Sequence, residues 1–389
     1  LGASHLERVT LPDGLLTIGS YAFYNCPVLS SVDIPDSVTG IGGLAFTLTP
    51  YLRGLKSEFT VVGDGVLLRY YPQRGEKKTL IATENATPVT RGGRIVGVSL
   101  TVPEGVRCIA SAFAECDDIV AVTLPASLTA LSDYAFYHAA FLEQVTFSGE
   151  SRLTSLGEAA FQDCRLLSSI TIPPTVTSLG ASLFLDCLSL SEITVPSSVT
   201  ALPSMIFAEC TGLATVRLPD TLRSIGEYAF SSCYALKSIT LPASVTTVSS
   251  YAFSESGLTA ADIPPTVTAV GTYLFIGCKS LTSASFAASV DRLPAGTFMA
   301  CTALTDVRLG GRYTSVDAES FYQCTALTSL TLPDSVTAIG REAFSGCTLL
   351  SRVFGIRPTA VEASAFSDCR ALSDIDLSGV DPNSWFTIK

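Results

Sequence analysis

Residues 210–233, CTGLATVRLPDTLRSIGEYAFSSC, decide the fold of this chain. Val216, Arg217 and Leu218 alternate apolar and polar side chains with period two, which predicts a short strand that Pro219 ends. Beyond the strand the small or apolar positions lie three or four residues apart, which predicts a helical turn; they are Ala229, Phe230, Cys233 and Leu236. One strand and one helical turn cannot bury their apolar faces alone, so copies of the same unit must cover them.

The unit recurs along the chain, and one phenylalanine marks its register. The marker residues are Phe23, Phe46, Phe113, Phe136, Phe161, Phe184, Phe207, Phe230, Phe253, Phe275, Phe298, Phe321, Phe344 and Phe366. Most steps are 23 residues, but the step that ends at Phe161 is 25, because residues 147–153 (FSGESRL) form a turn-like bulge. A period this regular predicts a single repeat domain over residues 1–389.

The pattern fails between Phe46 and Phe113. Residues 59–71 and 79–83 have the composition of strands, and residues 72–78 (PQRGEKK) supply turn residues between them. We therefore expect a β-hairpin or irregular insertion over residues 47–98, with one degenerate repeat as an alternative for part of it. Residues 381–389, which contain the single Trp385, are expected to form a C-terminal cap or a linker.

Composition excludes several function classes. Hydrophobic residues make up 47% of the chain and charged residues 15%, which is enough for a large core. The net charge of −11 argues against general binding of nucleic acid or of anionic lipid. No apolar run approaches ~18 residues, so we expect no direct membrane insertion. Because the chain begins inside a repeat, we expect upstream residues, including a signal peptide, to have been removed.

The consensus of the repeat resembles a known family. Residues 327–347, LTSLTLPDSVTAIGREAFSGC, match Leu-x-x-Ile-x-Leu-Pro-x-x-Val-x-x-Ile-Gly-x-x-Ala-Phe-x-x-Cys, with Leu330 at the first Ile position. This pattern is similar to the BspA-type leucine-rich repeat of bacterial and protist cell-surface proteins. The resemblance implies an α/β solenoid, a right-handed arc of about 14–15 repeats of 22–23 residues with a parallel β-sheet on its concave face. It also implies adhesion to host molecules, and it supplies no ligand-binding residues.

Eleven of the twelve cysteines occupy one repeat position. They are Cys26, Cys116, Cys164, Cys187, Cys210, Cys233, Cys278, Cys301, Cys324, Cys347 and Cys369. Stacked equivalents point the same way, whereas a disulfide needs side chains turned toward each other, so we expect a structural ladder of reduced core thiols. No CxxC or Cys/His pairing supports a metal site. Cys108 lies outside the ladder and is expected to be exposed or, alternatively, bonded to Cys116.

The position between the two strand hydrophobes is expected to face the concave surface. Threonine holds it in half of the repeats, which suits either a solvated strand face or a sugar-binding hydroxyl face. The departures are more informative. Arg308 with Asp306, and Arg352 with Phe354, are ligand-binding candidates, because arginine beside an exposed aromatic residue is typical of binding hot spots. Ordinary surface is the alternative interpretation.

The predicted hairpin supplies a second group of candidates. Arg69, Tyr70, Tyr71 and Arg74 combine aromatic and basic side chains on a segment expected to protrude, which suits an acidic partner or a glycan. The alternative is a solvated loop whose tyrosines pack on the repeats.

Catalysis has little support. His5 and His138 are the only histidines, and neither accompanies a recognisable nucleophile motif. Acidic residues before the repeat Cys form a surface column rather than an acid and base pair. We therefore expect no enzyme, no cofactor and no metal.

Three functions remain open. The leading hypothesis is an extracellular or cell-surface module that binds a host protein or glycan. The second is a structural spacer or envelope component whose binding activity lies in flanking regions. The third is an intracellular interaction scaffold, which a ladder of unpaired thiols would permit.

Overall fold

The computed structural model describes residues 2–75, 79–310, 312–355, 358–362 and 364–375. Their contacts divide the chain into two compact units, residues 1–199 and residues 200–389. Both units consist of coils that stack through parallel strands. The predicted single domain over residues 1–389 remains a prediction, and residues 381–389 lie outside the described residues.

Each regular coil supplies two short strands. The first strand ends at the repeat Pro position, and a tight turn follows, in which the Leu222 amide donates to the Pro219 carbonyl at 3.0 Å. The second strand ends at the repeat glycine, because the backbones of successive coils come too close there for a side chain. A Cβ added at Gly226 would lie 2.5 Å from the carbonyl carbon of Pro203. We refer to the two sets of strands as the first-strand and second-strand sheets.

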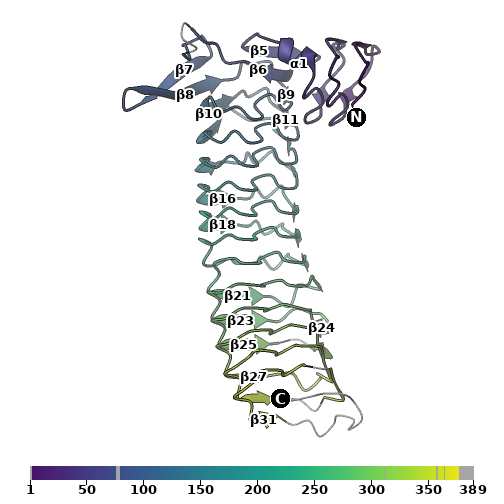
Figure 1. Cartoon of the computed structure of the whole chain (residues 1–389), viewed down its shortest axis with the longest axis vertical. Helices are drawn as coiled ribbons and strands as arrows, with labels where there is room; N and C mark the ends of the chain where they lie inside the picture. The colour runs from purple at the N-terminus through teal and green to yellow at the C-terminus, as the bar shows by residue number, and fades with distance from the viewer. Residues whose placement is uncertain (1, 76–78, 311, 356–357, 363, 376–389) are drawn as a thin grey trace. The chain divides into compact units, whose positions relative to one another are not determined.

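In residues 1–199 the two sets of strands lie as follows (Figure 1). The first strands are β1 (Arg8–Thr10), β3 (Ser31–Asp33), β7 (Ala86–Arg91), β8 (Arg94–Thr101), β10 (Ile119–Leu124), β12 (Gln144–Phe147), β14 (Ser169–Ile170) and β16 (Glu192–Thr194). The second strands are β2 (Thr17–Ile18), β4 (Gly40–Ile41), β5 (Phe59–Val62), β6 (Val66–Tyr70), β9 (Cys108–Ile109), β11 (Ala130–Leu131), β13 (Ser155–Leu156) and β15 (Ser178–Leu179).

The described residues of the second unit, 200–389, repeat the arrangement without a comparable interruption. The first strands are β18 (Thr215–Arg217), β21 (Ala260–Ile263), β23 (Ser283–Phe286), β25 (Asp306–Leu309), β27 (Ser329–Thr331), β29 (Arg352–Phe354) and β31 (Asp374–Ile375). The second strands are β17 (Ala201–Leu202), β19 (Ser224–Ile225), β20 (Thr247–Val248), β22 (Ala269–Val270), β24 (Arg292–Leu293), β26 (Ser315–Val316), β28 (Ala338–Ile339) and β30 (Ala360–Val361). Equivalent residues of successive coils pair in register, for example Ala284 with Val307.

The predicted helical turn around the marker phenylalanine is not helical. The residues two before and two after it adopt left-handed backbone conformations, as at Tyr228 (φ 54°) and Ser232 (φ 56°). These two reversals break a right-handed helix and point alternate amides at the next coil, where Phe230 donates to the Ala252 carbonyl at 2.8 Å. Among the described residues the one α-helix is α1 (Pro50–Gly54). The α/β description is therefore corrected: the described residues form a β-solenoid with almost no helix.

The interruption between Phe46 and Phe113 differs from the predicted hairpin. Residues 59–71 do not form one strand that pairs with 79–83, because Gly63 and Gly65 (φ 57° and 75°) turn the chain between β5 and β6, which pair antiparallel. A second antiparallel pair, β7 with β8, follows. The inner strand of each pair continues the solenoid in parallel, β6 against β9 and β8 against β10. The segment thus supplies two strands to each set of strands in this unit, β5 and β6 to the second strands and β7 and β8 to the first.

The first two coils lie beside the coils that follow the interruption (Figure 1). The Ser20 hydroxyl donates to Asp133 at 2.9 Å, and the Leu44 amide donates to the Ser111 hydroxyl at 3.0 Å. The rings of Tyr21 and Tyr134 meet edge to face at 6.0 Å. This lateral contact joins residues that are 67 or 113 positions apart, in contrast to the period-23 contacts of the stack.

The marker phenylalanines form the core of both units. In residues 1–199 the rings of Phe113, Phe136, Phe161 and Phe184 stack with centroid distances of 4.7–5.6 Å. In residues 200–389 an unbroken stack runs from Phe207 to Phe366 with distances of 5.2–5.7 Å. The rings are nearly parallel and buried, so each internal ring is covered by the coils on both sides.

Hydroxyl side chains also join successive coils. Ser244 donates to the Leu222 carbonyl at 2.6 Å, and Thr282 donates to the Thr259 carbonyl at 3.0 Å. These bonds satisfy carbonyl groups of the preceding coil, which explains the abundance of serine and threonine at fixed repeat positions. The predicted concave face and right-handed sense are not tested by these pairings and stay predictions.

Candidate interaction surfaces

The first-strand sheet of residues 200–389 brings four candidate residues to one exposed face. Strand register places Arg308 beside Ser285, and Phe354 beside Thr331. Strands β25 and β27 belong to consecutive coils and are in contact. Asp306 and Arg352 lie two residues before Arg308 and Phe354 on the same strands, so all four side chains point to the same side.

These charged residues form ion pairs along this face. Arg308 Nη2 lies 3.6 Å from Asp306 Oδ2, and Arg352 Nε lies 3.8 Å from Asp374 Oδ2 on β31. All four side chains are more than half exposed, from 57% to 81%. Exposed ion pairs of this kind contribute little to stability, so the arginines can exchange their partners for groups on a ligand at small cost.

Phe354 provides an apolar contact point among these charges. Its side chain remains 43% exposed, although β29 lies between β27 and β31 and pairs with both. Its carbonyl accepts from the Leu332 amide at 2.9 Å, which fixes the backbone. We call Asp306, Arg308, Arg352, Phe354 and Asp374 the Arg–Phe cluster. Asp374 was not predicted from the sequence. It could have been identified because it lies 22 residues, one repeat, after Arg352 and carries the opposite charge.

The hairpin tyrosines are not both exposed: for Tyr70 the structure agrees with the alternative interpretation, in which the tyrosines pack on the repeats. This side chain is only 4% exposed and packs between Phe59 and Phe113, with ring centroids 5.6 and 5.7 Å away. It takes the place of a marker phenylalanine at the end of the stack that Phe113 begins. Burial raises the pKa of its phenol well above the ordinary range.

The other hairpin candidates contact the protein itself. Arg69 is half-buried and donates to the Leu52 carbonyl, while burial lowers the pKa of its guanidinium. The Lys56 ammonium lies over the ring of Tyr71, 4.3 Å from the ring centroid, in a cation–π contact. Arg74 pairs with Asp118 at 2.5 Å. These contacts tie residues 69–74 to their own unit, and Tyr71 keeps partial exposure.

The ladder cysteines are buried except for Cys116, which is partly exposed. The Cys301 thiol donates to the Phe275 carbonyl of the preceding coil at 3.1 Å, and the other cysteines with the same bond are Cys164, Cys187, Cys233, Cys278, Cys324, Cys347 and Cys369. Only a protonated thiol can donate this bond. Burial favours that form, since it raises the pKa of Cys278 to about 11.

Cys108 is buried, contrary to the prediction that it is exposed. Its side chain is 3% exposed and its sulfur lies 3.3 Å from the Ser132 hydroxyl. It belongs to the hydrophobic cluster that also contains Ile18 and Ile41 of the first two coils. The cysteine is a small side chain that lets those coils pack against β9, and it is not bonded to Cys116.

The acidic column near His138 forms local ion pairs. Asp163 is nearly buried, 3.8 Å from His138 Nδ1 and 3.0 Å from Arg165. Burial, with a smaller contribution from Asp163, raises the pKa of Asp186 on the next coil. Within the described ranges, no group of three or more His, Cys, Asp and Glu side chains could hold a metal ion.

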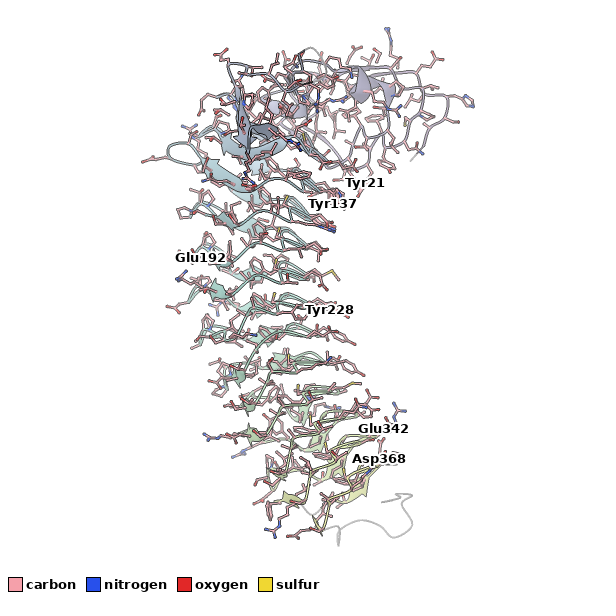
Figure 2. All side chains as sticks on the ribbon, turned by 60° about the vertical axis from the view of Figure 1, so that its left-hand side comes forward. Tyr21, Tyr137, Glu192, Tyr228, Glu342 and Asp368 are labelled. Carbon is pink, nitrogen blue, oxygen red and sulfur yellow. The ribbon has the colours of Figure 1, made fainter. Side chains whose placement is uncertain are left out.

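A tyrosine stack was missed in the sequence. Tyr228, Tyr251 and Tyr273 occupy the left-handed position before the marker phenylalanine, and their rings stack at 4.6 and 5.1 Å. The Tyr273 ring covers Gly296, where a Cβ would lie 2.1 Å from the ring, and its hydroxyl donates to Glu319 at 3.2 Å. Figure 2 shows Tyr228 on the same side of this unit as Glu342 and Asp368. The available signal was tyrosine at the same repeat position in three consecutive repeats.

The sequence profile of the BspA-type leucine-rich repeat region matches residues 2–62, 98–214, 202–324 and 291–383. The chain belongs to the BspA-type leucine-rich repeat family. The profile omits residues 63–97, which contain all of β6, the 72–85 segment, β7 and the first half of β8. No curated protein matches the chain.

Solved structures of bacterial leucine-rich repeat proteins share the fold. A leucine-rich cell-surface protein from Faecalibacterium prausnitzii is 27% identical, with a TM-score of 0.50 over 82% of this chain and 92% of that one. A leucine-rich repeat protein from Bacteroides ovatus is 24% identical, with a TM-score of 0.50 over 79% of this chain and 100% of that one.

Membership of this family has a general functional meaning. Leucine-rich repeat proteins typically mediate protein interactions and are typically non-catalytic. In the part of the chain that the structure describes, no helix has the length and hydrophobicity needed to cross a bilayer.

Proposed function

We propose that this protein is a non-catalytic recognition module, secreted or held at a cell surface, that binds a host protein through the Arg–Phe cluster. The observation that supports the proposal is the partly exposed ring of Phe354 on the same strand as the exposed Arg352. Arginine and aromatic residues carry most of the binding energy in protein interfaces. The family, and the cell-surface relative from Faecalibacterium prausnitzii, support the location.

The charge pattern favours a protein partner over a polyanion. The cluster contains two arginines and two aspartates in weak, exposed pairs, so its own charge is balanced. A polyanionic glycan or nucleic acid would meet the aspartates as well as the net charge of −11. A protein surface of mixed charge can pair with both signs and cover the Phe354 ring.

The test is a binding array of purified mammalian extracellular-matrix and serum proteins, probed with the intact chain and with the double variant Arg352→Ala/Phe354→Ala. We expect at least one protein to bind the intact chain, and the double variant to bind it at least about a hundredfold more weakly, as for hot-spot residues. The control is Arg217→Ala, which removes an exposed arginine outside the cluster, at the repeat position that Phe354 holds in its own coil.

Two results would overturn the proposal. Equal binding by the intact chain and the double variant would remove the cluster from the interface. No binding to any protein on the array would favour the spacer interpretation. Point substitutions are preferable to deletion of residues 59–83, since that deletion would remove β5 and β6 from the sheet.

A further inference from the structure

The bulge at residues 147–153 creates a cavity on the first-strand side of residues 1–199. At this point the coil carries two extra residues, and Gly149 adopts a left-handed conformation (φ 59°) that turns the chain outward. The Leu153 amide donates to the Ser151 hydroxyl at 3.2 Å, which stabilises the loop. Between this loop and residues 171–175 of the next coil lies a cavity of about 630 Å³.

One part of the cavity wall is apolar. Phe147 is the last residue of β12 and is half-buried, and it lines the cavity. Pro173 and Pro174 of the next coil also line it. An aromatic ring and two proline rings in one lining offer apolar surfaces to the C–H groups of a ligand.

The other part of the wall is hydroxylic. Thr171 and Ser151 line the cavity, and the Thr171 hydroxyl has no hydrogen-bond partner among the residues that the structure describes. Glu150 supplies the single charged group of the lining, is exposed, and forms no ion pair within the described part of the chain. A free hydroxyl and a free carboxylate are left to bond a ligand.

We infer that this cavity binds a neutral sugar of one or two rings. Its volume lies within the usual range for small-molecule sites. A pyranose ring presents an apolar C–H face, which Phe147 and the prolines can cover, and hydroxyls that can donate to Glu150 and bond Thr171. An anionic sugar would be repelled by Glu150. The site is independent of the Arg–Phe cluster, and either can fail alone.

The experiment measures the binding of five sugars to the intact chain by saturation-transfer NMR, and their affinities by titration. The sugars are lactose, maltose, cellobiose, chitobiose and 3′-sialyllactose. We expect at least one neutral disaccharide to bind, with Thr171→Val weakening it about tenfold, as for the loss of one hydrogen bond. Glu150→Gln should also weaken it. The matched control is Thr194→Val, because Thr194 holds the same strand position one coil later, outside the cavity.

Three results would overturn the inference. The first is that no neutral disaccharide binds at millimolar concentration. The second is that Thr171→Val and Thr194→Val bind equally well. The third is that 3′-sialyllactose binds as tightly as lactose. Far-ultraviolet circular dichroism of each variant checks that it is folded, which we expect because both threonines are exposed.

Discussion

Ala300 lies at the left-handed position after the marker phenylalanine, with φ 58°. Other coils of the same unit hold glycine there, Gly277 (φ 71°) and Gly346 (φ 76°). For an L-amino acid this conformation costs roughly 1–2 kcal/mol, and glycine avoids most of that cost.

Ala300→Gly is therefore expected to stabilise the protein by about 0.5–1 kcal/mol, after subtraction of the larger chain entropy of glycine in the unfolded state. The measurement is the urea midpoint followed by circular dichroism. The control is Ala303→Gly, three residues later, where φ is not positive and the same change should destabilise. A lower midpoint for Ala300→Gly would contradict the strain argument.

At the scale of single residues, exposure could be predicted from the sequence for positions inside a regular repeat, but not for positions at or near the interruption. Arg308 and Phe354 hold an outward position of a regular strand, so their exposure follows from the period. Tyr70 lies in the interruption, where the repeat register does not apply, and Cys108 lies in β9, the first regular second strand after it. Their burial depends on Phe59, Phe113 and the first two coils, which no local pattern identifies.

The phenylalanine stack is the element that holds successive coils together. Phe230 is fully buried between Phe207 and Phe253, whereas Phe366 stacks on Phe344 at one end of the described stack. We expect Phe230→Ala to lower the free energy of unfolding by about 3–5 kcal/mol and Phe366→Ala by less. Urea denaturation of both variants measures the difference. Equal losses would count against a stack that is stabilised from both sides.

The helical turn was predicted wrongly for a physical reason. Ala229, Phe230, Cys233 and Leu236 have helical spacing, but two left-handed residues flanking Phe230 place the same side chains inward. Apolar spacing therefore did not distinguish the two conformations. Glycines at the flanking positions, Gly277 and Gly296, were the available signal. The Gly63-Asp64-Gly65 turn similarly gave β5 and β6 a shorter hairpin than predicted.

At the scale of the whole molecule, the many buried thiols should make stability depend on pH. Burial raises the pKa of Cys278 and of Cys369 to about 11, whereas an unfolded thiol has a pKa of about 8.5. Above pH ~8.5 the unfolded chain loses protons that the folded chain keeps, so folding stability is complete below that pH and falls as pH rises toward about 11.

We expect the free energy of unfolding, measured by urea denaturation, to be nearly constant from pH 7 to 8. From pH 9 to 10.5 it should fall by up to about 1.4 kcal/mol per pH unit for each thiol. Cys278→Ala removes one such group and should show a shallower decline than the unmodified protein. An identical decline in both proteins would assign the effect to other groups, such as tyrosines.

The fold of the whole chain could be predicted largely from its period, because contacts at 22–25 residues recur through both units. The lateral contact of the first two coils could not. It depends on single pairs such as Ser20 with Asp133, which occur once and have no repeat signature. The cavity beside Glu150 was equally hidden, although the 25-residue step marked its location.

The bonds between coils have a consequence for how such a gene can change. In a regular coil the amides around the marker phenylalanine donate to the following coil. The serine and threonine hydroxyls and the cysteine thiol donate to the preceding coil. Each coil therefore presents to its neighbours the same donors and acceptors that it requires from them. Duplication or loss of one 23-residue segment inside the regular run would leave every type of bond intact, so chain length can drift during evolution. The bulge at 147–153 and the strands of 59–101 occur once, and unequal recombination there would destroy them.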